Sequence, residues 1–297
     1  MSSWQGKTRG GQFGYWFFIQ ILKFPGIKFA YFFLYFVSTY YVLFVPKARK
    51  PIFWYFRNIQ KFSFIKSLVF TFRNFYVFGQ VIIDKVALMA GFAKNFTFNF
   101  DGEELIQKMA DGGGGLLVGA HVGNWEIAGH LLERINTKVH IVMLEAEHEK
   151  IKSMLDSVMT EKKMSIIAIK DDFSHLFKIK KAFENNEIVA MHGDRFLAGT
   201  NTIKLDFFGK KAEFPLGPFL LAVKYKKPIS FVNAFKESST HYHFFATKGL
   251  VKSSKSSIKE RHKTAENILK EYVSTLENSL KKYPEQWFNY YYFWDNI

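Results

Sequence analysis

Positively charged and aromatic residues are concentrated in the first third of this 297-residue chain, and that asymmetry most constrains how the chain can fold. Residues 1–100 hold 13 Lys and Arg but a single acidic residue, Asp84, together with 31 of the 55 aromatic residues. A region both basic and apolar predicts a membrane-contacting surface, because aromatic rings enter the acyl boundary while Lys and Arg meet lipid phosphates. The alternative is a Phe-rich but soluble helical region.

Residues 29–45 (FAYFFLYFVSTYYVLFV) form a run of 17 residues without a charge. A membrane-spanning helix needs about 20 apolar residues, and 17 is near the lower limit. Cationic residues lie on both sides of the run, so the positive-inside rule assigns no orientation. The pattern therefore fits a helix that lies in one leaflet as well as one that spans. No small-residue cleavage site follows, which disfavours a secretory signal, and Pro46 and Pro51 should end the helix.

Residues 52–78 intersperse four basic residues among Phe, Trp and Tyr, which predicts a basic amphipathic helix at a membrane interface. The same mixture occurs in proteins that bind single-stranded nucleic acid. We expect no nucleic-acid partner, because the aromatic runs are too continuous for a soluble binding surface. Residues 1–98 are therefore predicted to be an N-terminal helical region that anchors the chain to a membrane bilayer.

From residue 99 onward, short apolar runs alternate with segments of helical periodicity. We expect strands at residues 116–121, 139–144, 165–170, 187–191, 229–235 and 241–249. We expect helices at residues 102–110, 125–135, 148–162, 174–186, 216–226 and 258–282, the first capped by Asp101. The alternation predicts an α/β domain over residues 99–297, with a mainly parallel sheet flanked by helices. Sites in such sheets form at the carboxyl ends of strands, which directs attention to residues 120–126 and 192–196.

Several kinds of chemistry are disfavoured by the sequence. The chain has no cysteine, which excludes a disulfide framework, a thiolate zinc site and a cysteine nucleophile. Residues 112–115 are four glycines that precede a strand, whereas a phosphate loop follows one, so they predict a turn. The sequence contains no G-x-S-x-G elbow. His241 and His243 alternate on one strand without an evident third ligand, so no metal site is expected there.

The segment GAHVGNWE (119–126) is the strongest candidate for a catalytic site. His121 ends a predicted strand and Glu126 falls in the first turn of the next helix, so the carboxylate can reach back to the imidazole across the corner. Such a pair would hold one ring nitrogen protonated and leave the other free to take a proton from a hydroxyl. Asn124 is predicted to cap that helix, and Gly123 permits the sharp corner. A histidine at a strand end is more often structural than catalytic, so the pair alone leaves both roles open.

The spacing from His121 to Glu126 resembles the H-x4-D/E block of the lipid A biosynthesis acyltransferases, a branch of the glycerolipid acyltransferase superfamily. The segments MHGDRF, FPLGP, KPI and PEQWF follow in the order seen in that family, so the resemblance covers most of the chain. Members that act on glycerol phosphates carry Glu where this chain has Leu216, which favours the lipid A branch. Lipid A enzymes usually carry Asp-Gln where this chain has Asp194 and Arg195, which leaves the acceptor open.

The resemblance implies transfer of a fatty acyl chain from an acyl carrier protein thioester to a hydroxyl of an anionic lipid A precursor. The enzyme would sit at the bacterial inner membrane with its site facing the cytoplasm. His121 would act as general base with Glu126 as its partner, by direct attack, without a covalent intermediate, a metal or a cofactor. The residues expected to contact the substrates are Asn124, Asp194, Arg195, Phe214, Pro215 and Gly217.

Arg195 is expected to bind a phosphate or carboxylate of the acceptor. A structural ion pair with Asp194 is the alternative. The same chemistry on an amino-acid lipid, a glycolipid or a phospholipid is a second reading of the function. A non-catalytic membrane scaffold is a third, and an absent His–Glu corner would be its sign.

Overall fold

The computed structural model describes residues 26–89, 91–92, 94, 96–125, 127, 135–144, 164–170, 172–197, 199–249 and 257–294. Its strands are β1 (Thr97–Asp101), β2 (Gly115–Gly119), β3 (Val139–Leu144), β4 (Met164–Ile169), β5 (Ile188–His192), β6 (Thr202–Phe207), β7 (Lys210–Pro215), β8 (Ile229–Lys236) and β9 (His241–Gly249). Its helices are α2 (Ile27–Phe44), α3 (Pro46–Trp54), the π-helix η1 (Tyr55–Ile59), α4 (Phe64–Met89), α5 (Glu103–Asp111), α7 (Ser174–Glu184), α8 (Gly217–Tyr225), α9 (Ile258–Lys282) and the 3₁₀-helix η4 (Pro284–Gln286).

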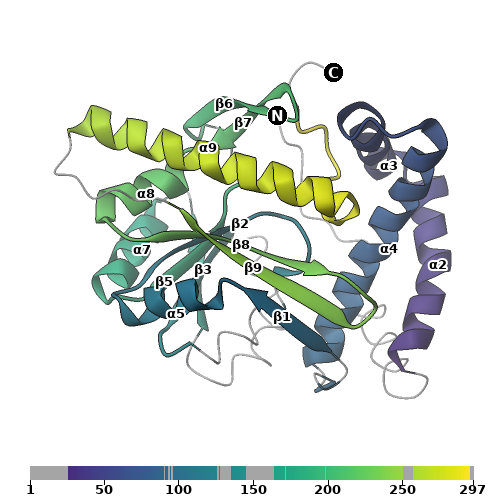
Figure 1. The fold of residues 1–297 in the computed structure, drawn as a ribbon, viewed down its shortest axis with the longest axis horizontal. Helices are drawn as coiled ribbons and strands as arrows, with labels where there is room; N and C mark the ends of the chain where they lie inside the picture. Colours follow the sequence, from purple (N-terminus) through teal and green to yellow (C-terminus); the bar gives the residue numbers. More distant parts are fainter. Residues whose placement is uncertain are drawn as a thin grey trace.

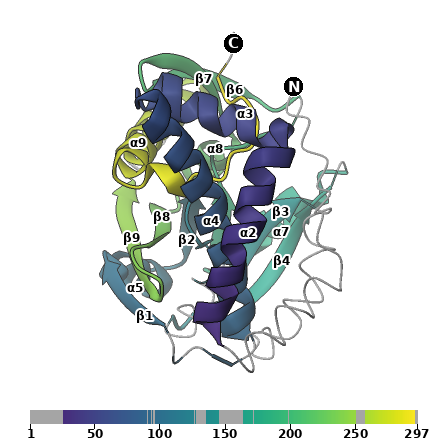
Figure 2. The same cartoon turned by 90° about the vertical axis from the view of Figure 1, so that its right-hand side faces the viewer.

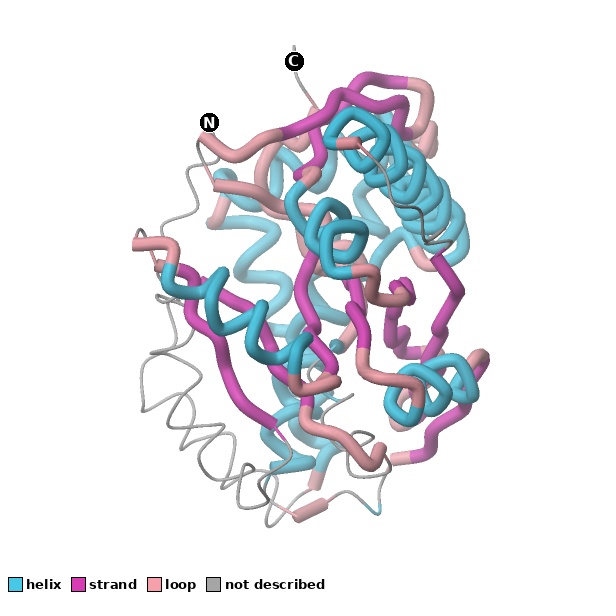
Figure 3. Tube along the Cα trace, turned by 90° about the vertical axis from the view of Figure 1, so that its left-hand side faces the viewer, coloured by secondary structure: helices cyan, strands magenta, loops and turns pink. Residues whose placement is uncertain are grey.

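A seven-stranded sheet lies at the centre of the protein, in the order β1-β9-β8-β2-β5-β3-β4 (Figure 1). Its neighbouring strands run parallel, except for the antiparallel pair β8 and β9. Strands β6 and β7 form a separate antiparallel pair. Figure 3 shows the strands in magenta with helices in cyan on both sides. The α/β fold with a mainly parallel sheet, predicted from the alternation, is confirmed.

Alternate residues of the strands point to opposite faces of the sheet and form two layers of hydrophobic core. On one face, side chains such as Leu116 and Val118 pack with α7, α8 and α9. On the other face, Leu117 packs near Met109 of α5, while Ala234 and Tyr242 pack against α2 and α4. The central strand β2 is buried along its whole length, as expected for a parallel strand covered on both faces.

Most predicted elements agree with the structure within two residues, and three predictions were wrong. The predicted helix over residues 52–78 is broken between η1 and α4, where Lys61 has a φ of 57° that a helix cannot accommodate. Asp101 does not cap α5, because it is the last residue of β1 and Gly102, with a φ of 83°, takes the cap position. Strands β1, β6 and β7 were not predicted at all.

Other predictions are confirmed or fall outside the described residues. Helix α2 occupies the charge-free run and ends at Phe44, before Pro46. The glycine run forms a turn over residues 112–114, in which Gly113 and Gly114 have positive φ, and Gly115 begins β2. The predicted helix over residues 148–162, and most of the one over residues 125–135, lie outside the described residues.

The N-terminal helices pack on one side of the sheet, with α2 lying alongside α4 (Figure 2). The contact is close, because a Cβ added at Gly79 of α4 would come within 2.4 Å of Leu34 of α2. Among the described residues, α2 is the helix long and apolar enough to cross a membrane, judged by length and composition.

Candidate active site

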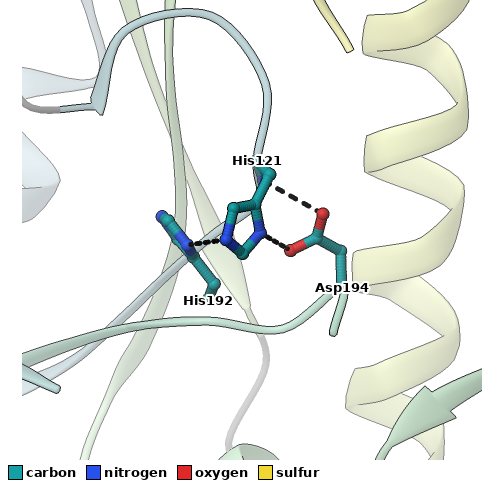
Figure 4. A group of neighbouring side chains, drawn as sticks. All are labelled: His121, His192 and Asp194. Carbon is teal, nitrogen blue, oxygen red and sulfur yellow. Dashed lines mark hydrogen bonds and ion pairs between the residues drawn. The ribbon is translucent and has the colours of Figure 1, made fainter. Parts of the chain in front are cut away.

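The carboxyl ends of β2 and β5 meet at the centre of the sheet and bring three polar side chains together. The two strands are parallel neighbours in which Gly119 is paired with His192. His121 follows β2 by two residues, and Asp194 follows β5 by two residues. Because the offsets are equal, both residues emerge at the same edge of the sheet (Figure 4). These residues lie on the two segments that the strand-end rule selected.

His121 and Asp194 are joined by two hydrogen bonds. The Nδ1 atom of His121 lies 2.8 Å from Oδ1 of Asp194, and the backbone N–H of His121 donates to Oδ2 at 3.0 Å. The Asp194 side chain is 1% exposed, whereas that of His121 is 21% exposed and open to a substrate. Burial opposes the charged form of Asp194, but His121 and Arg195 outweigh it and hold the pKa of this carboxyl below its usual range. The carboxylate therefore fixes the proton of His121 on Nδ1.

His192 lies on the opposite nitrogen of the His121 ring. Its Nδ1 atom is 3.3 Å from Nε2 of His121, and the two rings meet edge to face with centroids 4.2 Å apart. Trp125 contacts the ring of His192, with the two ring centroids 5.3 Å apart and the ring planes nearly perpendicular. Burial, followed by the charges of His121 and Arg195, lowers the pKa of His192 to about 3. His192 is therefore neutral at any pH at which the protein would work.

The corner after β2 is built by Gly123 and Asn124. Gly123 has a φ of 59°, and a Cβ at this position would lie 1.9 Å from the carbonyl oxygen of Ala234, so only glycine fits. The buried Asn124 accepts a hydrogen bond from the backbone N–H of Ile127 at 3.3 Å, as predicted for a capping residue. Its Nδ2 donates to the hydroxyl of Tyr242 at 3.2 Å. Asn124 thus faces the protein interior, where it supports the corner.

Arg195 reaches from the site toward the C-terminal segment. Its Nη2 donates to the carbonyl oxygen of Phe288 at 2.9 Å, and its guanidinium lies 5.8 Å from the ring centre of Tyr291. Phe288 also returns a hydrogen bond to the corner, from its N–H to the carbonyl of His121 at 3.1 Å. The Nε–H of Arg195 is buried and finds no acceptor among the described residues. A donor is therefore available beside the two histidines.

The FPLGP segment lies at the end of β7 and the start of α8. Phe214 is fully buried, and its ring packs against Phe207 and Phe293 at 5.3 and 5.4 Å. Pro215 is buried as well, whereas Gly217 is half-buried at the first turn of α8. Substrate binding by these three residues stays a prediction.

Glu126, the predicted partner of His121, lies outside the described residues. The sequence reasoning also missed two features. It assigned Asp194 to substrate binding rather than to the ring of His121, and it gave His192 no role. One signal was available for both, since His192 and Asp194 follow directly on a predicted strand, at the position where sites form in parallel sheets.

Three groups could approach a metal ion: within the described ranges, the ligand atoms of His121, His192 and Asp194 lie within 4.8 Å of one another. The carboxylate, however, already accepts the Nδ1–H and the backbone N–H of His121, on the far side of that ring from His192. A shared ion would have to break both bonds. The arrangement fits a general base better, because it fixes the tautomer of His121 and leaves a lone pair on its Nε2, the atom that faces His192.

A second histidine cluster lies at the opposite edge of the sheet. His140 is 2.6 Å from both Glu187 and Ser165 through its two ring nitrogens. These residues stand at the amino ends of β3, β4 and β5. Sites in parallel sheets form at the other edge, so the His121 cluster is the stronger candidate.

Comparison with known proteins identifies the family. Residues 72–294 match the family described as bacterial lipid A biosynthesis acyltransferase. The matched range includes most of α4, the whole sheet and the His121 cluster. A search of curated proteins finds no match.

Proposed function

The chain belongs to the bacterial lipid A biosynthesis acyltransferases, and from that premise we propose that His121 is the general base of its reaction. The protein is an acyltransferase that uses an acyl donor and a lipid acceptor. We further propose an acyl carrier protein thioester as the donor and a hydroxyl of a lipid A precursor as the acceptor. The observation that carries the proposal is the Nδ1 atom of His121, held 2.8 Å from the buried Asp194 at the strand ends.

The reaction follows from that geometry. Because Asp194 holds the proton on Nδ1, the Nε2 atom of His121 can take the proton of the acceptor hydroxyl. The hydroxyl oxygen then attacks the thioester carbonyl and forms a tetrahedral oxyanion. The resulting imidazolium is stabilised by the Asp194 carboxylate, and it returns the proton to the leaving thiolate. We also keep in the proposal the role predicted for Glu126, that of a carboxylate partner of His121.

Arg195 is proposed to bind an anionic group of the acceptor. Its unpartnered Nε–H and its proximity to the histidine cluster support this role, because a buried donor gains most from a charged acceptor. The bond to Phe288 holds the guanidinium in place rather than neutralising it, since a carbonyl carries no net charge. The alternative of an ion pair with Asp194 is less favoured, because the guanidinium donates to the carbonyl oxygen of Phe288, although its charge still helps to lower the pKa of Asp194.

We propose that α2 lies along the cytoplasmic surface of the inner membrane rather than crossing it. Phe29, Phe32, Phe36 and Leu43 are between 46% and 61% exposed, and their spacing places them on one face of the helix. This apolar face can enter the acyl boundary. The exposed basic side chains of α2, α3 and their neighbours that can meet lipid phosphates are Lys28, Lys47, Lys50, Arg57, Lys61 and Lys66.

Contacts at both ends of α2 support the in-plane orientation. Near its start, the Tyr31 hydroxyl lies 2.9 Å from the carbonyl oxygen of Ser239, between β8 and β9. Near its end, the ring of Tyr41 lies 5.8 Å from Phe75, which stacks on Tyr290 of the C-terminal segment at 5.3 Å. A helix held near its start by the loop between β8 and β9, and near its end by α4, fits an in-plane position better than a spanning one.

Fluorophores attached at positions 29, 36 and 43 should therefore report one shallow depth in vesicles. The chain has no cysteine, so the three single-cysteine variants can be labelled one at a time. Depth-dependent quenching by brominated lipids gives the measurement. A spanning α2, about 27 Å long, would instead place the middle label deepest and the outer two in opposite leaflets. A label at Phe177, an exposed residue of α7, is the control that should stay outside the bilayer.

The test of the function is a lipid mass profile of bacterial cells that contain the wild-type chain, His121→Ala or no copy. Wild type alone should add one acyl mass to lipid A, while His121→Ala should match the deletion. If another lipid gains the acyl group, the chemistry stands and the acceptor is wrong, with Arg195 the first residue to vary. If no lipid differs between wild type and His121→Ala, His121 is not the base.

A further inference from the structure

His192 lies against the ring nitrogen of His121 that would take the proton from the acceptor hydroxyl. Asp194 holds the proton of His121 on Nδ1, so Nε2 of His121 carries a bare lone pair. The Nδ1 atom of His192 faces that lone pair at 3.3 Å. Where His121 is neutral, two lone pairs at this distance would repel, so His192 then carries its own proton on Nδ1 and donates it to Nε2 of His121.

The ring of His192 is fixed in this orientation. It ends β5 opposite Gly119, where an added Cβ would lie 3.4 Å from its Cδ2 atom, so β2 bounds the ring on one side at van der Waals distance. Trp125 bounds the ring on another side. A donor confined in this way needs little reorganisation when charge develops next to it, which favours stabilisation of an oxyanion.

We propose that His192 is a catalytic hydrogen-bond donor whose Nδ1–H caps the lone pair of His121 in the resting site and moves to the substrate oxygen during acyl transfer. The inference rests on the proposed role of His121 as the base. It assigns His192 a function in the same reaction. A neutral imidazole is suited to it, because it donates to an oxyanion without giving up its own proton.

The step balances in atoms and charge. When the acceptor hydroxyl approaches Nε2 of His121, the Nδ1–H of His192 leaves that lone pair and donates to the thioester carbonyl oxygen. The acceptor O–H bond then breaks, its proton goes to Nε2 of His121, and the oxygen forms a bond to the carbonyl carbon, whose oxygen becomes negative. When the tetrahedral intermediate collapses, the C–S bond breaks and the thiolate takes the proton from His121. The capping bond to His192 then re-forms.

Asparagine and glutamine at position 192 separate donation from other roles. The amide nitrogen of asparagine can occupy the place of Nδ1, whereas that of glutamine falls near Nε2. With purified protein, acyl carrier protein thioester and lipid acceptor in mixed micelles, we expect His192→Asn to keep kcat within about tenfold of wild type. We expect His192→Gln and His192→Ala to lose about 10²- to 10³-fold in kcat with little change in KM, as for a lost oxyanion donor. Equal losses in all three variants would overturn the proposal, because they would indicate proton relay through both nitrogens. No loss in any variant would overturn it as well.

A measurement without substrate separates this proposal from the function itself. In protein labelled with ¹⁵N-histidine, at a pH where His121 is neutral, the shifts of His192 should report a neutral ring with its proton on Nδ1, since the pKa of His192, about 3, is far lower. In His121→Ala the acceptor is gone, and the proton should move to Nε2. An Nε2–H tautomer in the wild-type protein would overturn the role of His192 whatever the activity. A wild-type protein that transfers no acyl chain would instead overturn the proposed function, while the tautomer still decides whether His192 is the donor.

Discussion

Replacing Asp194 by asparagine is expected to lower kcat by about 10⁴-fold, the size of the loss seen when the carboxylate behind a catalytic histidine becomes an amide. The carboxylate does two things that an amide cannot. It accepts from Nδ1 and from the backbone N–H of His121 at once, which fixes the tautomer and the position of the ring. It also carries the negative charge that stabilises the imidazolium. Substrate binding should change little, so the loss should fall on kcat rather than KM.

Glu126→Gln, measured in the same assay, is the matched comparison for Asp194→Asn. Both changes turn into an amide a carboxylate that has been assigned as the partner of His121. If Asp194 holds the ring, Glu126→Gln should cost less than Asp194→Asn. If Glu126→Gln abolishes transfer while Asp194→Asn keeps a tenth of the activity or more, the partner is Glu126, as the sequence predicted, and the assignment of Asp194 fails.

The segments that form the candidate site could be predicted from the sequence, but the contact between His121 and Asp194 could not. The alternation of strands and helices, together with the strand-end rule, selected residues 120–126 and 192–196. Which strand lies next to β2 depends on the sheet order, and no local pattern encodes that order. The prediction therefore paired His121 with Glu126, its near neighbour in sequence. The structure places against His121 a residue 73 positions away.

The break between η1 and α4 shows a similar limit. The aromatic and basic residues of 52–78 satisfy a helical period throughout, so the pattern contains no stop signal at Lys61. The break is a tertiary feature, since Gln60 donates to the carbonyl oxygen of Leu280 at the end of α9 at 3.1 Å. The hairpin of β6 and β7 was missed for a different reason. Its strands pair with each other outside the central sheet and lack the continuous apolar runs by which the buried strands were found.

Asp84→Ala is expected to destabilise the protein by about 3–5 kcal/mol, because it leaves a buried charge without its partner. Asp84 is the single acidic residue of the first hundred and is fully buried in α4. Lys236 of β8 donates to its carboxylate at 2.5 Å, and the hydroxyls of Tyr31 and Tyr242 donate to it as well. Three donors around one carboxyl group fit its ionised form. Burial raises the pKa of Asp84 and lowers that of Lys236, so each charge depends on the other.

Thermal unfolding followed by circular dichroism in detergent micelles should give a fall in Tm of about 10 °C for Asp84→Ala. Asp206→Ala is the control: this side chain is 72% exposed, its ion pair with Lys211 is on the surface, and its loss should cost less than about 1 kcal/mol. The double variant Asp84→Leu, Lys236→Met removes both charges and should recover more than half of the lost stability. In the double variant no charge is left unpaired, and only the two neutral tyrosine hydroxyls lose their hydrogen-bond acceptor. If Asp84→Ala instead has the same Tm as wild type, Lys236 finds water or another partner, and the network does not hold α4 on the sheet. A double variant no more stable than Asp84→Ala would show that the loss comes from the tyrosine hydroxyls rather than from the stranded charge.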